Sequence, residues 1–238
     1  MRIWEIDFIR GLAIIFMIIF HFIVDLKDFY SYPLEYLSGF WYIEGKLSAI
    51  LFMLICGVSS TLGTNSTHHG IKVFLWAMLL TVGTYFYNEN CYIRFGILHF
   101  LGISLLSAHF IHRLPTYWIM MLSGASILVG ILFSTYYVSN PYLFPIGLIN
   151  SAFISMDYYP IFPWYGVYLF GFALGKTFYG AKAKFTFLQT SHQGSEFLVN
   201  LFSSSPFNLI SCLGQHSLAV YLIHQPILLL ALYLFHGR

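Results

Sequence analysis

The 238 residues of this protein are 58% hydrophobic and 20% aromatic, and only 8% are charged. A soluble domain has about 25% charged residues, so this composition excludes an ordinary soluble protein and indicates one that lies in a lipid bilayer. The formal net charge of +2 gives no sign of a nucleic-acid partner.

The first predicted element is a membrane-spanning helix that carries ionisable residues. The apolar run from Phe8 to Leu26 is long enough to cross a bilayer, which takes roughly 20 residues. One stripe of this helix, at steps of three or four residues, is formed by Asp7, Arg10, Ile14, Met17, His21 and Asp25. Ionisable groups inside a membrane face protein or water and usually mark a pathway or a reaction site. The alternative is that the stripe only packs the helix through satisfied polar pairs.

Six more apolar runs follow, which gives seven predicted spans. They are Leu47 to Leu62, Ile71 to Tyr87, Phe95 to Phe110, Tyr117 to Tyr137, Ile161 to Phe178 and Leu218 to Phe235. Tyr142 to Phe153 and Phe197 to Cys212 are too short or too interrupted for a clear span. We expect them to be half-helices, interfacial segments or an extra pair of spans. An extra pair would raise the number of spans to nine. We therefore predict an all-α, polytopic transmembrane helical bundle formed by a single domain over residues 1–238.

The distribution of Lys and Arg predicts the orientation of this bundle. With a cytoplasmic N-terminus, seven basic residues lie on the inner side and four on the outer side. The inner ones are Arg2, Arg10, Lys72, Arg113, Lys176, Lys182 and Lys184, and the outer ones are Lys27, Lys46, Arg94 and Arg238. Because cytoplasmic loops are enriched in Lys and Arg, we expect a multi-pass protein of the cell (inner) membrane with its N-terminus inside and its C-terminus outside.

Five ionisable residues are candidates for chemistry. His21 lies about two thirds of the way out along the first span, and Asp25 lies one helical turn further. An imidazole with a nearby carboxylate is the arrangement that general base catalysis needs. With this topology, His99 and Asp157 also lie near the outer side, and His224 lies near the middle of the last span. Membrane histidines often bond to carbonyl groups, so His99 or His224, taken alone, is as easily structural.

Two further patterns concern packing and metals. Gly171 and Gly175 are spaced for close helix packing, which predicts either an internal contact or a homodimer. The cysteines Cys56, Cys91 and Cys212 stand far apart without ligand spacing. Neither a disulfide framework nor a metal site is therefore predicted.

Four motifs give the chain a family resemblance. They are Glu5 to Ala13 with Met17 and His21, Phe95 to His99, Asp157 to Trp164, and Leu213 to Pro226. In this order they resemble the motifs of the bacterial relatives of heparan-alpha-glucosaminide N-acetyltransferase, within a wider superfamily of multi-span acyltransferases. The resemblance implies transfer of an acetyl group from cytosolic acetyl-CoA to an amino or hydroxyl acceptor, usually a sugar, on the far side of the membrane.

The stripe on the first span fits such a transfer. Asp7 and Arg10, at its inner end, are the predicted cofactor-binding residues, because Arg suits bidentate contacts with the phosphates of CoA. His21 is expected to act as the base on the acceptor or to carry the acetyl group transiently as a nucleophile. His224 is a second candidate for proton transfer.

The remaining predicted residues, Asp25, His99 and Asp157, are expected to orient the base or to hold acceptor hydroxyls. Two other classes of function fit intramembrane charges as well. A transporter or flippase would also place ionisable residues inside the membrane, although the chain has no evident internal repeat. The other class is a non-catalytic membrane partner protein.

Overall fold

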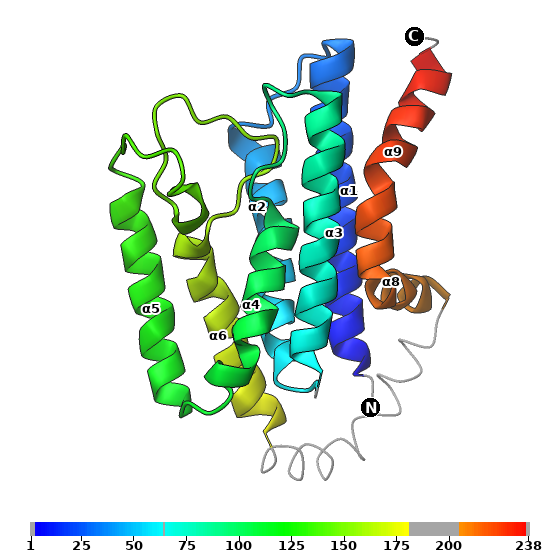
Figure 1. Ribbon diagram of the computed structural model, residues 1–238. Coiled ribbons are helices and arrows are strands. Elements are labelled where there is room, and N and C mark those ends of the chain that lie inside the picture. The colour runs from blue at the N-terminus through cyan, green and yellow to red at the C-terminus, as the bar shows by residue number, and fades with distance from the viewer. Residues whose placement is uncertain (1–2, 64, 181–204, 237–238) are drawn as a thin grey trace. The chain divides into compact units, whose positions relative to one another are not determined.

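The computed structural model describes residues 3–63, 65–180 and 205–236 (Figure 1). Its helices are α1 (Trp4–Tyr30), α2 (Gly39–Ser60), α3 (Ser66–Tyr87), α4 (Ile97–Ile111), α5 (Thr116–Phe133), the 3-10 turn η1 (Phe144–Ile146), α6 (Ile161–Tyr179), α8 (Ser205–Gln215) and α9 (Ser217–His236). Within these residues β-pairing is limited to two isolated bridges. The predicted all-α helical bundle is confirmed.

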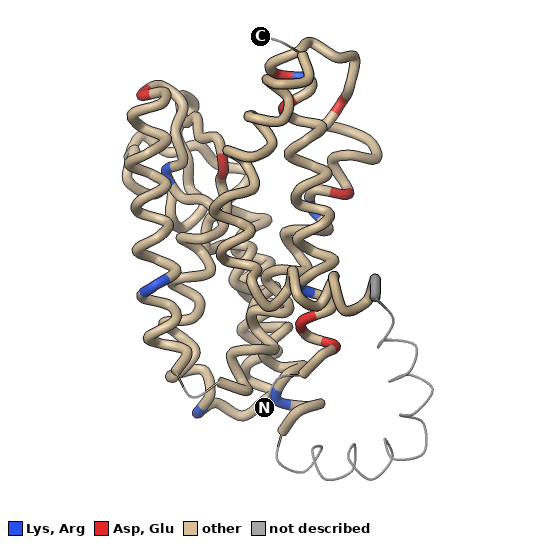
Figure 2. Tube along the Cα trace, turned by 90° about the vertical axis from the view of Figure 1, so that its right-hand side faces the viewer, with Lys and Arg blue, Asp and Glu red and all other residues tan. Residues whose placement is uncertain are grey.

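Each of the seven predicted spans coincides with a helix. Among the described residues, α1, α2, α3, α5 and α9 are long and apolar enough to cross a membrane, whereas α4 is apolar but has 15 residues and α6 does not reach the same length and apolarity together. The count of seven spans stays a prediction. Long stretches of these helices carry no charged residue (Figure 2). They therefore present apolar surface, as a multi-pass membrane protein requires.

The two stretches without a clear span, Tyr142 to Phe153 and Phe197 to Cys212, do not form long helices in the residues that the structure describes. Residues 142–153 contain only the three-residue turn η1. α8 has 11 residues, or about 16 Å at the helical rise, which is half of a bilayer core. Residues 197–204, like Lys182 and Lys184 of the predicted inner side, lie outside the described residues.

The residue contacts form two compact units, which we describe separately. Unit 1 comprises residues 1–52 and 189–238, and unit 2 comprises residues 53–188. α2 contributes its first part to unit 1 and its last part to unit 2. The prediction of a single domain over the whole chain stays a prediction.

In unit 1, the two ends of the chain pack against each other through glycine. A Cβ atom on Gly11 of α1 would overlap the carbonyl oxygen of Ile210 in α8. A Cβ atom on Gly214 would overlap the carbonyl oxygen of Asp7. Only glycine permits this approach of two helix backbones.

α9 then runs alongside α1 in the same direction (Figure 1). It begins three residues after Gly214, which lies against Asp7. Near its end, the ring of His236 packs on Tyr30, with 4.2 Å between ring centroids. Because the first and last helices are parallel, an odd number of crossings must separate them, and the five predicted spans from α2 to α6 satisfy this condition.

Unit 2 is built from close helix pairs. α3 pairs with α4 and α5 pairs with α6, in each case antiparallel. α6 also packs on the last part of α2, where a Cβ on Gly171 would overlap the carbonyl oxygen of Leu54 and a Cβ on Gly175 would crowd Thr61. The spacing of these two glycines therefore serves an internal contact, and a homodimer is not needed to explain it.

We expect Gly214→Ala to lower the free energy of unfolding by about 1–3 kcal/mol, because the added methyl group overpacks the contact between α8 and α1. Thermal unfolding of the purified protein in detergent measures this effect. The matched control is Gly124→Ala in α5, where the new Cβ would meet nothing within 4 Å. Equal melting temperatures for the two variants would contradict the close packing of α8 on α1.

Candidate functional site

The predicted polar stripe of α1 faces protein. Asp7, Ile14, Met17 and Asp25 are buried, and Asp25 is only 1% exposed. Arg10 and His21 on the same stripe are half-buried. The exposed side chains of α1 include apolar ones such as Ile19 and Phe22. The helix therefore turns its ionisable groups inward, as the spacing of the sequence predicts.

Within unit 1, α9 places His224 beside His21. The two imidazole rings lie 4.8 Å apart between centroids at an interplanar angle of 79°. The Nδ1 of His21 donates to the carbonyl oxygen of Met17 at 2.8 Å. The Nδ1 of His224 donates to the carbonyl oxygen of Tyr221 at 2.6 Å.

These bonds to carbonyls determine the chemistry of both rings. A carbonyl oxygen only accepts a hydrogen bond, so each Nδ1 carries the proton, and in the neutral ring Nε2 keeps its lone pair. The Nε2 of His224 is buried and has no hydrogen-bond partner among the described residues. Two neighbouring rings thus each keep a basic Nε2 inside unit 1.

Asp25 does not orient His21 in the predicted way. The Nδ1 of His21 is bound by the carbonyl of its own helix, and Asp25 Oδ1 accepts a hydrogen bond of 2.7 Å from Nε2 of Gln225 on α9. Spacing on α1 predicts which residues share a face, but it does not predict which partner each side chain selects. The role of Asp25 in catalysis stays a prediction.

Gln225 is a member of the site that sequence reasoning missed. The sequence feature that could have pointed to Gln225 is a polar amide between His224 and Pro226 in an apolar span. Among the described residues, its Oε1 and the Oδ2 of Asp25 are buried without a hydrogen-bond partner. We call His21, Asp25, His224 and Gln225 the histidine cluster. The Nε2 atoms of its two histidines, the Oδ2 of its aspartate and the Oε1 of its glutamine are hydrogen-bond acceptors. They suit a ligand rich in O–H or N–H groups.

The predicted cofactor-binding residues, Asp7 and Arg10, lie at the other end of the stripe, in the first turns of α1. Arg10 forms an ion pair of 3.1 Å with Asp7. Its guanidinium also reaches the carbonyl oxygen of Gly214 at 3.5 Å, where α8 meets α9. The Arg10 side chain remains 23% exposed, so a phosphate can still approach it. The binding of CoA by these residues stays a prediction.

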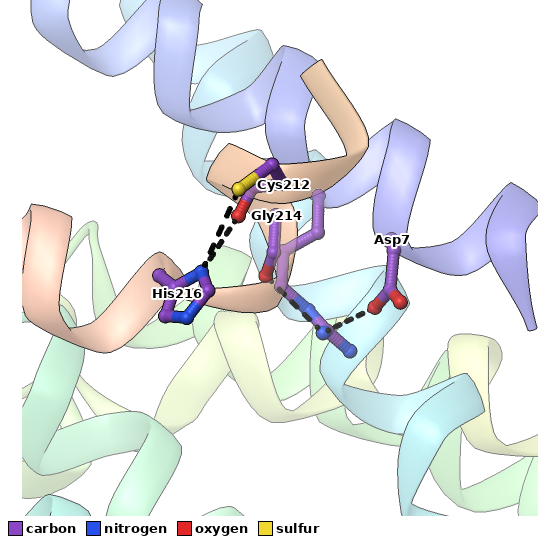
Figure 3. A network of polar contacts seen from close by, with 5 residues as sticks. Asp7, Cys212, Gly214 and His216 are labelled. Atoms are coloured by element: carbon purple, nitrogen blue, oxygen red, sulfur yellow. Dashed lines mark hydrogen bonds and ion pairs between the residues drawn. The ribbon is translucent and has the colours of Figure 1, made fainter. Parts of the chain in front are cut away.

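Beside this ion pair, His216 lies against Cys212. The Nδ1 of His216 lies 3.0 Å from the carbonyl oxygen and 3.9 Å from Sγ of Cys212 (Figure 3). This local bond closes the turn between α8 and α9.

In unit 2, the structure brings His99 and Asp157 together at the start of α4. Asp157 Oδ2 accepts a 2.9 Å hydrogen bond from the backbone N–H of Ile97, where a carboxylate also complements the helix dipole. The Nδ1 of His99 accepts from the N–H of Gly96 at 3.2 Å. Its Nε2 donates to Thr81 Oγ1 at 3.1 Å.

Both ring nitrogens of His99 are therefore occupied within the protein, unlike Nε2 of His224. The structure gathers His21, Asp25 and His224 in unit 1, and His99 with Asp157 in unit 2. The predicted convergence of all five on one substrate stays a prediction.

The comparisons with known proteins agree with this arrangement of motifs. A family model described as heparan-alpha-glucosaminide N-acetyltransferase, catalytic, matches residues 2–226. No curated protein and no solved structure matches the chain. The matched range includes α1, the start of α4, Asp157 and the pair His224 and Gln225 on α9. The chain therefore belongs to the heparan-alpha-glucosaminide N-acetyltransferase catalytic family, a family of membrane acyltransferases.

Proposed function

We propose that this protein transfers an acetyl group from cytosolic acetyl-CoA to an amino or hydroxyl group of a sugar acceptor on the outer side of the cell membrane. One observation carries the proposal: His21 and His224, contributed by opposite ends of the chain, lie 4.8 Å apart with both Nδ1 atoms bound to carbonyls. This pair offers two Nε2 lone pairs inside a membrane protein that belongs to an acyltransferase family.

The transfer needs one proton removed and one proton delivered. As the acceptor attacks the acetyl carbonyl, the Nε2 of His21 takes the proton of its hydroxyl or amino group. The carbonyl of Met17, bonded to Nδ1–H, stabilises the imidazolium that forms. The proton then passes to the sulfur of the leaving CoA, and the Nε2 of His224 is the second group that can carry it.

In the other version, His21 is the nucleophile. Its Nε2 forms a bond to the acetyl carbon as the C–S bond of the thioester breaks, so that CoA leaves as the thiolate and the acetylated ring is an imidazolium. The acceptor then attacks the acetyl carbon, which regenerates the free ring, and the proton that the acceptor loses passes to the sulfur of CoA. Both versions use the same nitrogen, and they differ in whether the protein itself becomes acetylated.

The other residues of the histidine cluster suit the acceptor. Asp25 Oδ2 and Gln225 Oε1 can each accept a hydrogen bond from a sugar hydroxyl, and the bond between the two side chains fixes their orientation. His99 and Asp157 are proposed to hold the acceptor through the loop that they order. Asp7 would orient Arg10 toward the phosphates of acetyl-CoA at the inner end of α1.

A transporter and a non-catalytic partner protein remain the alternatives. Binding of CoA distinguishes them from the enzyme, because neither requires it. Stabilisation of the purified protein against heat by CoA compounds, and not by unrelated nucleotides, supports the transferase.

We expect His21→Asn to lower the rate of acetyl transfer by about 10² to 10⁴-fold, the usual contribution of a general acid or base. Asparagine fills similar space and can still donate a hydrogen bond to Met17. The variant should therefore stay folded and bind CoA. The measurement is transfer from labelled acetyl-CoA to sugar acceptors, together with binding of CoA.

Labelled acetyl-CoA without an acceptor separates the two versions. Label retained by the wild-type protein and absent from His21→Asn indicates a nucleophile, and no retained label indicates a base. A His21→Asn protein with near wild-type turnover would contradict both versions and would move the chemistry to His99 or His224.

We expect Arg10→Lys to raise the KM for acetyl-CoA by about tenfold, with little change in the KM for the acceptor. Lysine keeps the charge but loses the planar fork that binds phosphate with two hydrogen bonds. Arg113→Lys is the control, because Arg113 is exposed and its side chain hydrogen-bonds to His109 within the same helix end. Unchanged affinity for CoA in a folded Arg10→Lys protein would leave this residue with a structural role only.

Reporter fusions test the proposed sidedness. We expect a fusion after residue 238 to report an outer C-terminus, because seven of eleven basic residues lie on the inner side when the N-terminus is cytoplasmic. The parallel course of α1 and α9 in unit 1 supports opposite locations for the two termini. A cytoplasmic reporter at residue 238 would reverse the proposed path of the acetyl group.

A further inference from the structure

The part of α2 that belongs to unit 1 carries a buried carboxyl group outside the histidine cluster. Glu44 is 9% exposed, and neither of its carboxyl oxygens has a hydrogen-bond partner among the described residues. The ion pairs seen within the same residues join Arg10 to Asp7 and Lys27 to Glu35, and Glu44 takes part in neither. A carboxylate that is buried without a partner is costly, whereas a carboxylic acid keeps one O–H donor for a ligand.

Two contacts between α1 and α2 show where Glu44 lies along α1. The Oγ of Ser48 donates to the carbonyl oxygen of Ala13 at 2.9 Å. Three residues earlier on α2, Gly45 lies against the ring of Phe20, which is seven residues later on α1. The two helices are therefore antiparallel within unit 1. Glu44, the neighbour of Gly45, lies at the level of the turn of α1 that carries Phe20.

This level is also the level of the histidine pair. His21 follows Phe20 on α1, and the centroids of their two rings are 5.8 Å apart. His224 reaches the same level from α9, where its ring lies against that of His21. Three helices of unit 1 thus contribute an ionisable side chain at one depth: α1 and α9 each contribute an imidazole, and α2 contributes the carboxyl group of Glu44.

The histidine cluster itself is short of hydrogen-bond donors. The Nδ1–H groups of His21 and His224 donate to backbone carbonyls, and the amide of Gln225 donates to Asp25. When a nucleophile attacks the acetyl carbonyl, the carbonyl oxygen becomes negatively charged, and enzymes stabilise such an oxyanion with well-placed donors. A carboxylic acid that apolar surroundings keep neutral is one such donor.

We propose that Glu44 holds a proton and donates a hydrogen bond to the oxygen of the acetyl carbonyl during the transfer. As the nucleophile bonds to the carbonyl carbon, one electron pair of the C=O bond moves onto this oxygen. The O–H of Glu44 stabilises the charge and keeps its own proton. The pair returns as the C–S bond breaks, and the proton of the acceptor reaches the sulfur of CoA. This inference rests on the proposed function, because it adds a catalytic residue to the same transfer.

The test compares an apolar and a hydrogen-bonding replacement of Glu44. We expect Glu44→Leu to lower kcat by about 10²-fold, the usual cost of one lost oxyanion donor, with the KM values for acetyl-CoA and acceptor unchanged. Replacing a buried ionisable group by an apolar one of similar volume is often neutral for stability. Glu44→Gln keeps an N–H donor and should retain kcat within about tenfold of the wild-type value. The control is Glu89→Leu, because Glu89 is an exposed acid in the loop after α3.

Thermal unfolding and binding of CoA establish that each variant is folded, and Glu44→Met serves as the apolar variant if Glu44→Leu is not. A wild-type kcat in the apolar variant overturns the proposal. A Glu44→Gln protein as slow as the apolar variant overturns it as well, because the essential feature is then a proton that Glu44 gives up. A rise in the KM for the acceptor alone identifies a carboxylate that binds the acceptor, and it also overturns the proposal. A wild-type protein that transfers no acetyl group contradicts the proposed function itself, and the role of Glu44 with it.

Discussion

The close approach of α8 to α1 is the interaction on which the rest of unit 1 depends. An ionisable stripe in a membrane helix is stable only where protein covers it, and the cover for the stripe of α1 comes from the far end of the chain. Gly11 and Gly214 allow the two backbones to meet. Their contact sets the register of α9, which then brings His224 to His21 and Gln225 to Asp25. The two glycines thus allow residues about 200 positions apart in the sequence to form one site.

The polar groups without partners have opposite character in the two units. In the histidine cluster of unit 1 they are acceptors: His224 Nε2, Asp25 Oδ2 and Gln225 Oε1. At Arg94 of unit 2 the group is a donor with a positive charge. The acceptors of the histidine cluster suit a ligand with hydroxyl or amino groups, whereas a purely apolar molecule would leave them without partners.

Much of this organisation could be predicted from the sequence, because hydrophobic length and helical period are local properties. The seven helices and the inward face of α1 follow from them, and four motifs in order led to the family. The partners of individual side chains did not follow. His21 hydrogen-bonds to the carbonyl of Met17 and not to Asp25, and Asp25 accepts its bond from Gln225. Both ring nitrogens of His99 form hydrogen bonds. These choices depend on side-chain rotamers and on packing between distant segments. Periodicity on one helix carries no information about these.

The geometry of the histidine pair bears on why two imidazoles are present. Acetyl transfer from a thioester removes a proton from the acceptor and returns one to sulfur. Two imidazolium ions at 4.8 Å would repel each other strongly in apolar surroundings, so the pair holds at most one extra proton at a time. Each Nδ1 is already committed to a backbone carbonyl, and that proton must therefore be bound at an Nε2. In the proposed transfer, two neighbouring rings that hold one extra proton between them can accept it from one substrate and deliver it to the other.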